Sequence, residues 1–486
     1  MQGAGSALLL RCWRASSSSW GAAAPWAASG SGAAAAAAAG ASAPARRRFG
    51  TIPDPDPEEV SLYDTQLAQP NYVQPIAITQ LDSLVRHPSL PLLVNSATFL
   101  KSQLPARLQN HIHRLSSLPP SSSPALRELL AGTVASKERG LEVAQDWRLV
   151  GTDDLEGLRH FESHLGTFKE HLEVEVGRLT SGAQALTETL GWWDDRQQVR
   201  HLNRVLDLCH WYLLSARVML AQHSAALAAL EAAGGGSGSG SGDSSGGARP
   251  RVIHYHEPGH AATSPTAPYA PPHQALPPAP PGAPRAASLV RRHAVLGDLV
   301  AGVADDCRAF CVEKNSAAPD VVLRGDTAAT ATLVVPYVEY VLTEVLKNAM
   351  QAVVNRYGAW EVDDASPVTV DIARLPAAPA AAPDGGAAAA GAAPGVEITV
   401  TDMGHGIPSG EISGHMFDYF WSKSKPSSSL YGYSRNHGSP FSGIGVGVPL
   451  ARVYAHFMGG SIEWETDSWR RHTTVKLTLP ANGFTF

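Results

Sequence analysis

The sequence has 486 residues, of which 44% are hydrophobic, and its formal net charge at pH 7 is −6. This length allows two or three domains, and the apolar fraction is sufficient for buried cores. The acidic balance argues against a nucleic-acid-binding surface. Four cysteines are too few and too scattered for a disulfide framework, and we expect Cys307 and Cys311, which share a helix face, to be reduced core thiols.

The first 50 residues carry five arginines and no acidic residue, among many alanines and serines. This composition is typical of an organellar transit peptide, and we assign residues 1–55 to such a peptide and a disordered tail. The Arg46–Phe49 stretch looks like a mitochondrial processing site and favours the mitochondrial matrix. A chloroplast transit peptide is the alternative, and a disordered alanine-rich tail is the simplest interpretation. The run Ala34–Ala39 is too short to cross a bilayer, and since no other apolar run is long enough we expect a soluble mature protein.

Residues 56–233 are expected to form an all-α bundle of about four long helices with short connections. Apolar residues recur there at helical spacing, and few stretches alternate as strands do. We place one helix from Ser96, with a break at Pro105. Two longer patterns predict helices over Leu155–Leu190 and Arg196–Leu230.

A glycine-serine stretch and then a proline-rich stretch form a predicted linker at 234–286. Beyond it, residues 287–486 mix both periodicities and predict an α+β sandwich, with helices on one face of a mixed sheet. An alanine-, proline- and glycine-rich insert at 376–394 is expected as a loop between two paired strands. The expected helices are 295–314 and 334–357, and the expected strands are 321–323, 368–373, 396–401, 461–465 and 473–479.

Three alternating glycines, Gly443, Gly445 and Gly447, precede a helical pattern that starts at Pro449. A glycine loop at a helix N-terminus exposes backbone N–H groups, and the helix dipole adds partial positive charge, a combination that holds phosphate. The spacing is neither that of a Rossmann motif nor that of a P-loop. Taken alone, the stretch is a weak signal, and a glycine-rich turn before an ordinary helix is the favoured interpretation.

Glu344, Lys347 and Asn348 share one face of the predicted helix 334–357. An amide oxygen can coordinate Mg²⁺, a lysine can meet phosphate charge, and a glutamate can deprotonate a nucleophile. A solvated helix face with an i, i+3 ion pair explains the same residues about as well.

Asp402 follows a predicted strand and begins a turn that contains Gly404 and Gly406. An aspartate at a strand end can accept from the amino group of adenine, and the two glycines let the backbone pass close to the base. A plain β-turn built from Asp and Gly is the alternative. We expect Asp402, as a strand-end aspartate, to be exposed and not part of the core.

Taken in chain order, the Glu344 helix face, the Asp402 turn and the glycine loop at 443–447 resemble the N, G1 and G2 boxes of the GHKL superfamily, which includes DNA gyrase, large heat-shock chaperones, histidine kinases and MutL repair proteins. The resemblance implies a Bergerat fold, here an all-α bundle followed by a GHKL α/β-sandwich. ATP would lie between the helices and a lid at about 417–441, whose Ser, Gly and Pro content fits mobility.

Two branches of that superfamily fit less well. The gyrase, chaperone and MutL group usually has an aspartate where Gln351 stands. Histidine kinases need a phospho-acceptor histidine with Thr or Asn four residues on, and His164, His171 and His201 all lack it.

The mitochondrial protein kinases that phosphorylate 2-oxo-acid dehydrogenase complexes are more similar. Glu344–Met350 matches their N box and Gly443–Pro449 their glycine loop, while Leu100–Arg107 and Asp207–His223 resemble segments of their bundle. The likeness covers most of residues 60–486. Further stretches slightly favour the branched-chain over the pyruvate dehydrogenase kinases, namely Pro336–Leu342, Asp418-Tyr419 and Gly459–Ser461.

This resemblance implies that Glu344 is the general base for a serine hydroxyl, that Asn348 binds Mg²⁺ and that Asp402 binds adenine. The implied ATP contacts are Lys347, Asn348, Gln351, Asp402, Gly404, Gly406, Ser422, Lys423, Gly443, Ile444, Gly445, Val446, Gly447, Val448 and Thr473. We also consider a K⁺ ion at Met416, Asp418 and Trp421.

The leading hypothesis is a mitochondrial serine kinase that inactivates a 2-oxo-acid dehydrogenase by phosphorylating its E1α subunit. The family implies a lipoyl domain of the E2 core as the partner of the bundle, and a homodimer. The chain departs from the family at Gln351, where an Arg is usual, at Ser422-Lys423, where a hydroxyl pair is usual, and at His472, where a Gly is usual. A histidine-kinase-like sensor and a non-catalytic ATP switch therefore stay as rivals.

Overall fold

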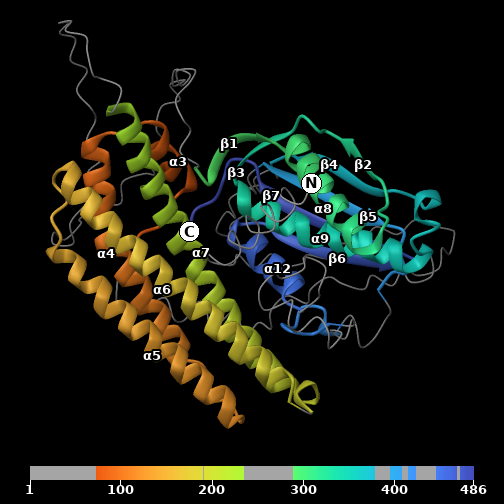
Figure 1. Cartoon of the computed structure of the whole chain (residues 1–486), viewed down its shortest axis with the longest axis horizontal. Helices are drawn as coiled ribbons and strands as arrows, with labels where there is room; N and C mark the ends of the chain where they lie inside the picture. Colours follow the sequence, from red (N-terminus) through yellow and green to blue (C-terminus); the bar gives the residue numbers. More distant parts are fainter. Residues whose placement is uncertain are drawn as a thin grey trace, which may run out of the picture.

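The computed structural model describes seven stretches of the chain, 73–189, 191–234, 288–377, 394–407, 414–422, 445–467 and 471–486. The predicted transit peptide, the linker, nearly all of the insert and most of the lid lie outside the described residues. Figure 1 shows a bundle of long helices beside a sheet that is covered by further helices. The predicted fold class, an all-α bundle followed by an α/β-sandwich, is confirmed.

The bundle contains a short helix α3 (Ile78–Arg86) and four long helices in the described residues. These are α4 (Leu90–Ser116), α5 (Pro124–Asp146), α6 (Leu155–Thr187) and α7 (Arg196–Gly234), with 3₁₀ turns η2 (Trp147–Leu149) and η3 (Trp192–Asp194) between them. Side-chain caps begin two of the helices. The Leu126 N–H donates to Ser123 Oγ at the start of α5, and the Gly157 N–H donates to Asp154 Oδ1 at the start of α6.

The prediction for α4 was wrong in two respects. The helix begins at Leu90 rather than Ser96, and it continues through Pro105 without a break. A proline inside a helix costs about 3 kcal/mol. Leu93, Leu100 and Leu104 are buried in the bundle on the same helix, and burying three leucines contributes more than that cost.

The second part of the chain combines a five-stranded sheet with helices. Its helices are α8 (Leu296–Asn315), α9 (Val335–Tyr357) and α12 (Gly447–Phe457), with a 3₁₀ turn η4 (Val362–Asp364). Its strands are β1 (Val290–Val295), β2 (Val321–Gly325), β3 (Thr330–Val334), β4 (Val368–Leu375), β5 (Gly395–Asp402), β6 (Ser461–Asp467) and β7 (His472–Pro480). All expected strands are therefore confirmed, with ends that differ by one or two residues.

The sheet has the order β2-β4-β5-β7-β6, in which only β2 and β4 run parallel. The expected pairing of the strands on either side of the insert is confirmed, since β4 and β5 are antiparallel neighbours. The helices α8, α9 and α12 pack on one face of this sheet (Figure 1). Two strands were not predicted: β1 and β3 form a separate antiparallel pair.

The bundle and the sandwich share a continuous apolar core. At their junction, Tyr337 of α9 donates from its hydroxyl to the Leu214 carbonyl of α7 at 3.1 Å. Its ring makes an edge contact with Tyr454 of α12 at 5.0 Å, and Phe457 makes another with Trp211 of α7 at 5.8 Å. The two parts are therefore packed against each other as one body at this junction.

One helix in the described part of the chain, Arg196–Ala233 within α7, is long and apolar enough to cross a membrane by length and composition. In the structure, 67% of its most apolar window is buried, which is the behaviour of a bundle core helix. The expectation that Cys307 and Cys311 are core thiols is also confirmed, because both are buried and neither is in a disulfide among the described residues.

Candidate nucleotide-binding site

The polar face predicted on α9 forms as expected. The Lys347 ammonium lies 2.6 Å from Glu344 Oε1, and both side chains are mostly shielded, at 11% and 15% exposure. Asn348 is exposed, and its side chain makes no hydrogen bond to any residue that the structure describes. The face therefore presents an ion pair at one end and an available amide beside it.

The N-terminus of α12 lies directly against this face. Gly447, the first residue of α12, meets the Glu344 carboxylate, and a Cβ at this glycine would overlap Glu344 Oε2. The helix begins two residues before the expected Pro449, and the residue that precedes it, Val446, offers no side-chain cap. Among the described residues, no side chain caps the first N–H groups of α12, and the partial positive charge of this helix end favours an anion.

Asp402 and Thr473 are brought together by the sheet. They are register partners at one end of β5 and β7, and both are buried, at 5% and 6% exposure. The expectation of an exposed Asp402 was wrong, because β5 is a central strand that pairs on both sides. Burial raises the pKa of Asp402 to about 7, and the hydrogen bond from the Gly404 N–H, at 2.9 Å, acts in the opposite direction.

The turn after Asp402 packs closely against α9. A Cβ at Gly404 would lie 2.5 Å from the Ala352 Cβ, so only glycine fits there without a shift. Gly406 has a φ of 69°, which a glycine adopts at little cost. Arg356 donates from Nη1 to the carbonyls of Met403 and Gly404, at 2.8 and 3.1 Å.

Sequence reasoning missed the role of Arg356. The signal was present, because Arg356 lies two helical turns after Asn348 on the same side of α9. Its bonds to two carbonyls fix the turn that follows Asp402.

Gln351 is engaged by protein groups. Its Oε1 accepts from the Lys314 ammonium of α8 at 3.2 Å, and its Nε2 donates to Asn355 Oδ1 at 2.8 Å. The side chain therefore links α8 to α9, and a direct contact with ATP stays a prediction.

The segment Gly414–Ser422, which includes Met416 and the first residues of the predicted lid (417–422) with Trp421, lies against α7. Both carboxylate oxygens of Asp418 accept from side chains of α7, Arg196 at 2.6 Å and Asn203 at 2.8 Å. The K⁺ ion at this place stays a prediction. Of the predicted ATP contacts, Lys423, Gly443 and Ile444 lie outside the described residues, while Val446 and Val448 pack against the apolar core.

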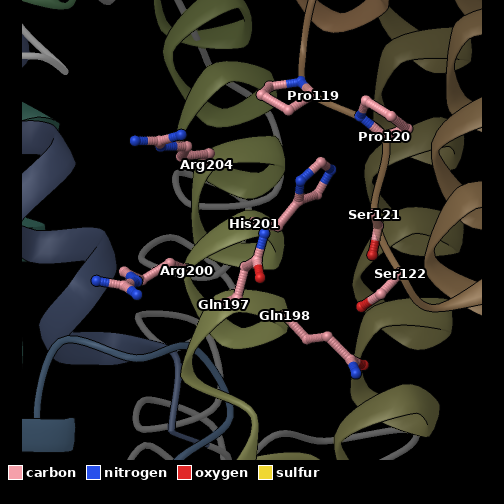
Figure 2. Close-up of a pocket in the computed structure, with 9 residues that line it drawn as sticks. All are labelled: Pro119, Pro120, Ser121, Ser122, Gln197, Gln198, Arg200, His201 and Arg204. Atoms are coloured by element: carbon pink, nitrogen blue, oxygen red, sulfur yellow. The ribbon is translucent and has the colours of Figure 1, made fainter.

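A cavity of about 250 Å³ lies in the bundle rather than at these residues. The connection from α4 to α5 and the first turns of α7 line it, including Ser121, Gln197 and His201 (Figure 2). None of the predicted ATP-contacting residues is part of its lining.

The metal predicted beside Asn348 is Mg²⁺. The described residues contain no group of three or more His, Cys, Asp or Glu side chains that could hold a metal by itself. Mg²⁺ commonly takes one or two protein oxygens and completes its shell with phosphates and water. The exposed Asn348 amide fits that requirement.

Comparison with known proteins supports the class of the domain that this geometry defines. Residues 335–483 match the family described as histidine kinase-, DNA gyrase B- and HSP90-like ATPase. The C-terminal part of the chain is therefore an ATP-binding domain of the GHKL superfamily, and that resemblance is confirmed.

The chain is further similar to mitochondrial [pyruvate dehydrogenase (acetyl-transferring)] kinases. It is 26% identical over 174 residues to the Drosophila melanogaster kinase, which covers 34% of this chain and 37% of that protein. It is 24% identical over 181 residues to the Arabidopsis thaliana kinase, and the match covers 34% of this chain and 41% of that protein. It is 23% identical over 180 residues to the Schizosaccharomyces pombe kinase, and the match covers 36% of this chain and 38% of that protein. The matched region spans about two fifths of the length of these relatives.

Proposed function

We propose that this protein is an ATP-dependent serine kinase that phosphorylates the E1α subunit of a mitochondrial 2-oxo-acid dehydrogenase complex. One observation carries the proposal: Glu344 of α9 lies against Gly447, where the uncapped N-terminus of α12 begins. A carboxylate and a phosphate-binding helix end are thereby placed side by side. That is the arrangement needed to bring a hydroxyl nucleophile to a phosphoryl group.

We propose a role for each of the site residues, and this geometry is compatible with these roles. Asp402, with Thr473 beside it, would accept from the adenine amino group, and the first N–H groups of α12 would hold the phosphates. Asn348 would bind Mg²⁺, which offsets phosphate charge when present. Lys347 would add a second positive charge on the same helix face.

Glu344 would act on the substrate rather than on ATP. Its carboxylate takes the proton of the serine hydroxyl while the serine oxygen bonds to the terminal phosphorus, and ADP leaves with the electrons of the broken P–O bond. The ion pair with Lys347, at 2.6 Å, keeps the carboxylate directed at the start of α12.

Two observations point to different substrates, the pyruvate and the branched-chain dehydrogenase complex. The relatives are named as kinases of pyruvate dehydrogenase, whereas the stretches at 336–342, 418–419 and 459–461 resemble branched-chain dehydrogenase kinases. We retain the branched-chain complex as slightly favoured. We propose four parts of the chain: a transit peptide and tail at 1–55, a bundle at 56–233, a linker at 234–286 and a kinase domain at 287–486. The bundle would dock a lipoyl domain of E2. The protein would act as a homodimer in the mitochondrial matrix.

The test is incubation with labelled ATP and purified pyruvate or branched-chain complex, followed by mapping of the label. The proposal predicts labelled serine on E1α of one of the two complexes. Acid-labile label on the protein itself would instead support a histidine-kinase-like sensor. ATP binding with no transferred label would support an ATP switch, which the engagement of Gln351 by protein groups favours as the second candidate.

A further inference from the structure

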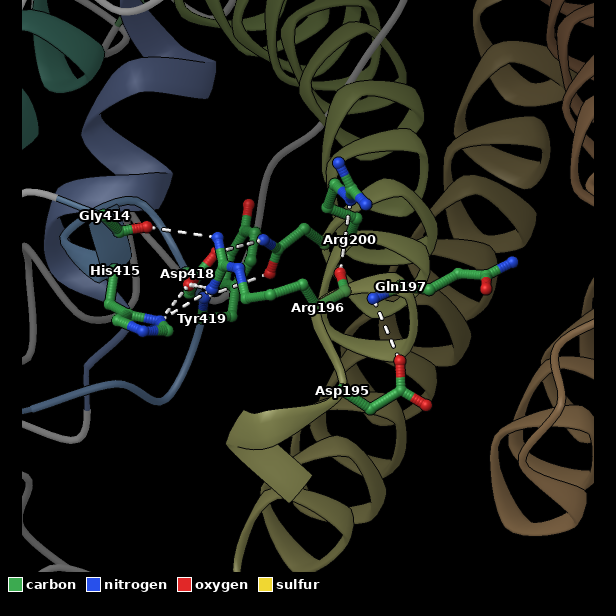
Figure 3. A network of polar contacts seen from close by, with 9 residues as sticks. Asp195, Arg196, Gln197, Arg200, Gly414, His415, Asp418 and Tyr419 are labelled. Carbon is green, nitrogen blue, oxygen red and sulfur yellow. Dashed lines mark hydrogen bonds and ion pairs between the residues drawn. The ribbon is translucent and has the colours of Figure 1, made fainter. Parts of the chain in front are cut away.

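The segment Gly414–Ser422 is attached to the bundle by an arginine at the first position of α7. Arg196 donates from Nη1 to Asp418 Oδ2 at 2.6 Å and lies 2.7 Å from His415 Nδ1, while its Nη2 donates to the Gly414 carbonyl at 3.1 Å (Figure 3). One guanidinium thus meets three residues of the segment. The Asp418 side chain is only 6% exposed, whereas the Arg196 side chain is 43% exposed, so the carboxylate is buried and the arginine covers it from the solvent side.

Two further residues of α7 continue this attachment. Asn203 donates from Nδ2 to Asp418 Oδ1 at 2.8 Å and accepts from the Tyr419 N–H at 3.2 Å. The Tyr419 hydroxyl donates to Asp207 Oδ1 at 2.8 Å. Arg196, Asn203 and Asp207 therefore hold one side of the segment along about three turns of α7.

The other side of the segment holds the glycine turn before α12. The Phe420 N–H donates to the Gly445 carbonyl at 2.8 Å. Gly445 has a φ of 73°, and a Cβ there would overlap the Trp421 carbonyl oxygen. The backbone of Gly414–Ser422 therefore sets the position from which Gly445–Gly447 enters α12.

Phe420 lies between the residues bonded to α7 and the glycine turn before α12. Its φ of 67° is left-handed, a conformation that costs a bulky residue free energy and persists only where the surroundings enforce it. The Arg196 and Asn203 bonds lie just before it, and the Gly445 bond is made by its own N–H. Without the bonds to α7, the backbone could relax and move the glycine turn with it.

We propose that Arg196, supported by Asn203, is a positioning residue for the nucleotide phosphates. It contacts none of the residues predicted to bind ATP, but it holds Asp418 and thereby the strained turn that places Gly445–Gly447 beside Glu344. This inference rests on the nucleotide site of the proposed function and adds that the bundle controls its phosphate-binding end.

Calorimetric titration of the full chain with MgATP, MgADP and adenosine tests the inference. Arg196→Ala should weaken MgATP and MgADP binding about tenfold or more, because the phosphate turn is released, and should leave adenosine binding within about twofold, because Asp402 is untouched. A tenfold loss corresponds to about 1.4 kcal/mol. Arg200→Ala, one turn further along α7 at an exposed position, is the matched control and should bind all three like the wild type.

Arg196→Lys provides a second variant that keeps the charge beside Asp418. It loses the forked contact with Gly414 and His415 and should weaken MgATP only a few-fold, less than Arg196→Ala. Unchanged MgATP affinity in both variants, or an equal loss for adenosine, would overturn the inference. Because the readout is binding, a wild type that binds MgATP but phosphorylates no E1α would contradict the kinase proposal and leave this test intact.

Discussion

Two carboxylates at the candidate site are held in different ways. Glu344 is paired with Lys347 and partly shielded, whereas Asp402 is buried and bonded to the backbone N–H of Gly404. Burial raises the pKa of Asp402 to about 7 from an ordinary value of 3.8. An acid whose pKa is raised in the folded state holds a proton that the unfolded chain releases.

For Asp402→Asn, we therefore predict a stability change that depends on pH. Between about pH 4 and pH 7 the folded wild type binds more protons at this position than the unfolded chain, so its free energy of unfolding falls as pH rises. The free energy of unfolding of the variant lacks this decrease. Relative to the wild type it should therefore rise by up to about 4 kcal/mol across that window, at about 1.4 kcal/mol per pH unit. Urea unfolding of both proteins from pH 4 to pH 8 measures the difference, and a difference independent of pH would contradict the burial argument.

Within the bundle, α5 and α6 are joined by an ion pair in the core. The Lys137 ammonium lies 2.5 Å from Glu175 Oε1, with side-chain exposures of 0% and 5%. The Lys137 ammonium also lies over the Tyr212 ring of α7, at 5.2 Å from its centroid. A buried pair contributes little net stability as a pair, but either partner alone is a buried, unpaired charge.

Lys137→Met should therefore destabilise the protein by about 3–5 kcal/mol, because Glu175 is left without its partner. The double variant Lys137→Met, Glu175→Leu should recover most of that loss. Arg159→Ala, which removes a pair with Glu231 whose side chains are 58% and 36% exposed, is the control and should change the free energy of unfolding by less than about 1 kcal/mol. Urea unfolding followed by circular dichroism gives all three values, and equal destabilisation of the single and double variants would refute this account.

Patterns within one element were readable from the sequence, whereas contacts between elements were not. The spacing of Glu344, Lys347 and Asn348 predicted their shared face, and alternation predicted the strands on either side of the insert. The strand β3, Thr330–Val334, was missed because it is buried along four of its five residues and so does not alternate. The break at Pro105 was wrong because tertiary burial outweighed local propensity, and the Arg196–Asp418 pair could not be predicted because 222 residues separate its members.

The bundle and the sandwich meet where α7 packs against α9 and α12, and again where α3 packs against β1. Tyr337 lies at the first of these junctions, with 1% of its surface exposed, a hydroxyl bond to α7 and ring contacts to α12. The positions of Arg196 and Asp418 relative to each other depend on the same junction. Loss of packing there should thus affect both parts of the chain.

Tyr337→Ala should cost about 3–5 kcal/mol, the usual result of removing a large buried aromatic side chain. Because the bundle and the sandwich share this contact, we further expect their unfolding transitions to separate in scanning calorimetry. Trp360→Ala, at a side chain that is 98% exposed, should leave the profile unchanged. A single transition in the Tyr337→Ala variant at the wild-type temperature would show that the junction does not couple the two parts.

The central claim, that Glu344 acts on a substrate hydroxyl beside bound ATP, is tested most directly by Glu344→Gln. MgATP affinity and transfer of labelled phosphate to the dehydrogenase subunit are measured on the same preparations, with Asn348→Ala in parallel. The substitution keeps size and helix propensity but removes the base, so ATP affinity should stay within a few-fold while transfer falls by about 10²–10⁴. Asn348→Ala should lower MgATP affinity and phosphate transfer together, because it removes the proposed Mg²⁺ ligand. Near-normal transfer by Glu344→Gln would contradict the account and leave Glu344 as the ion-pair partner of Lys347.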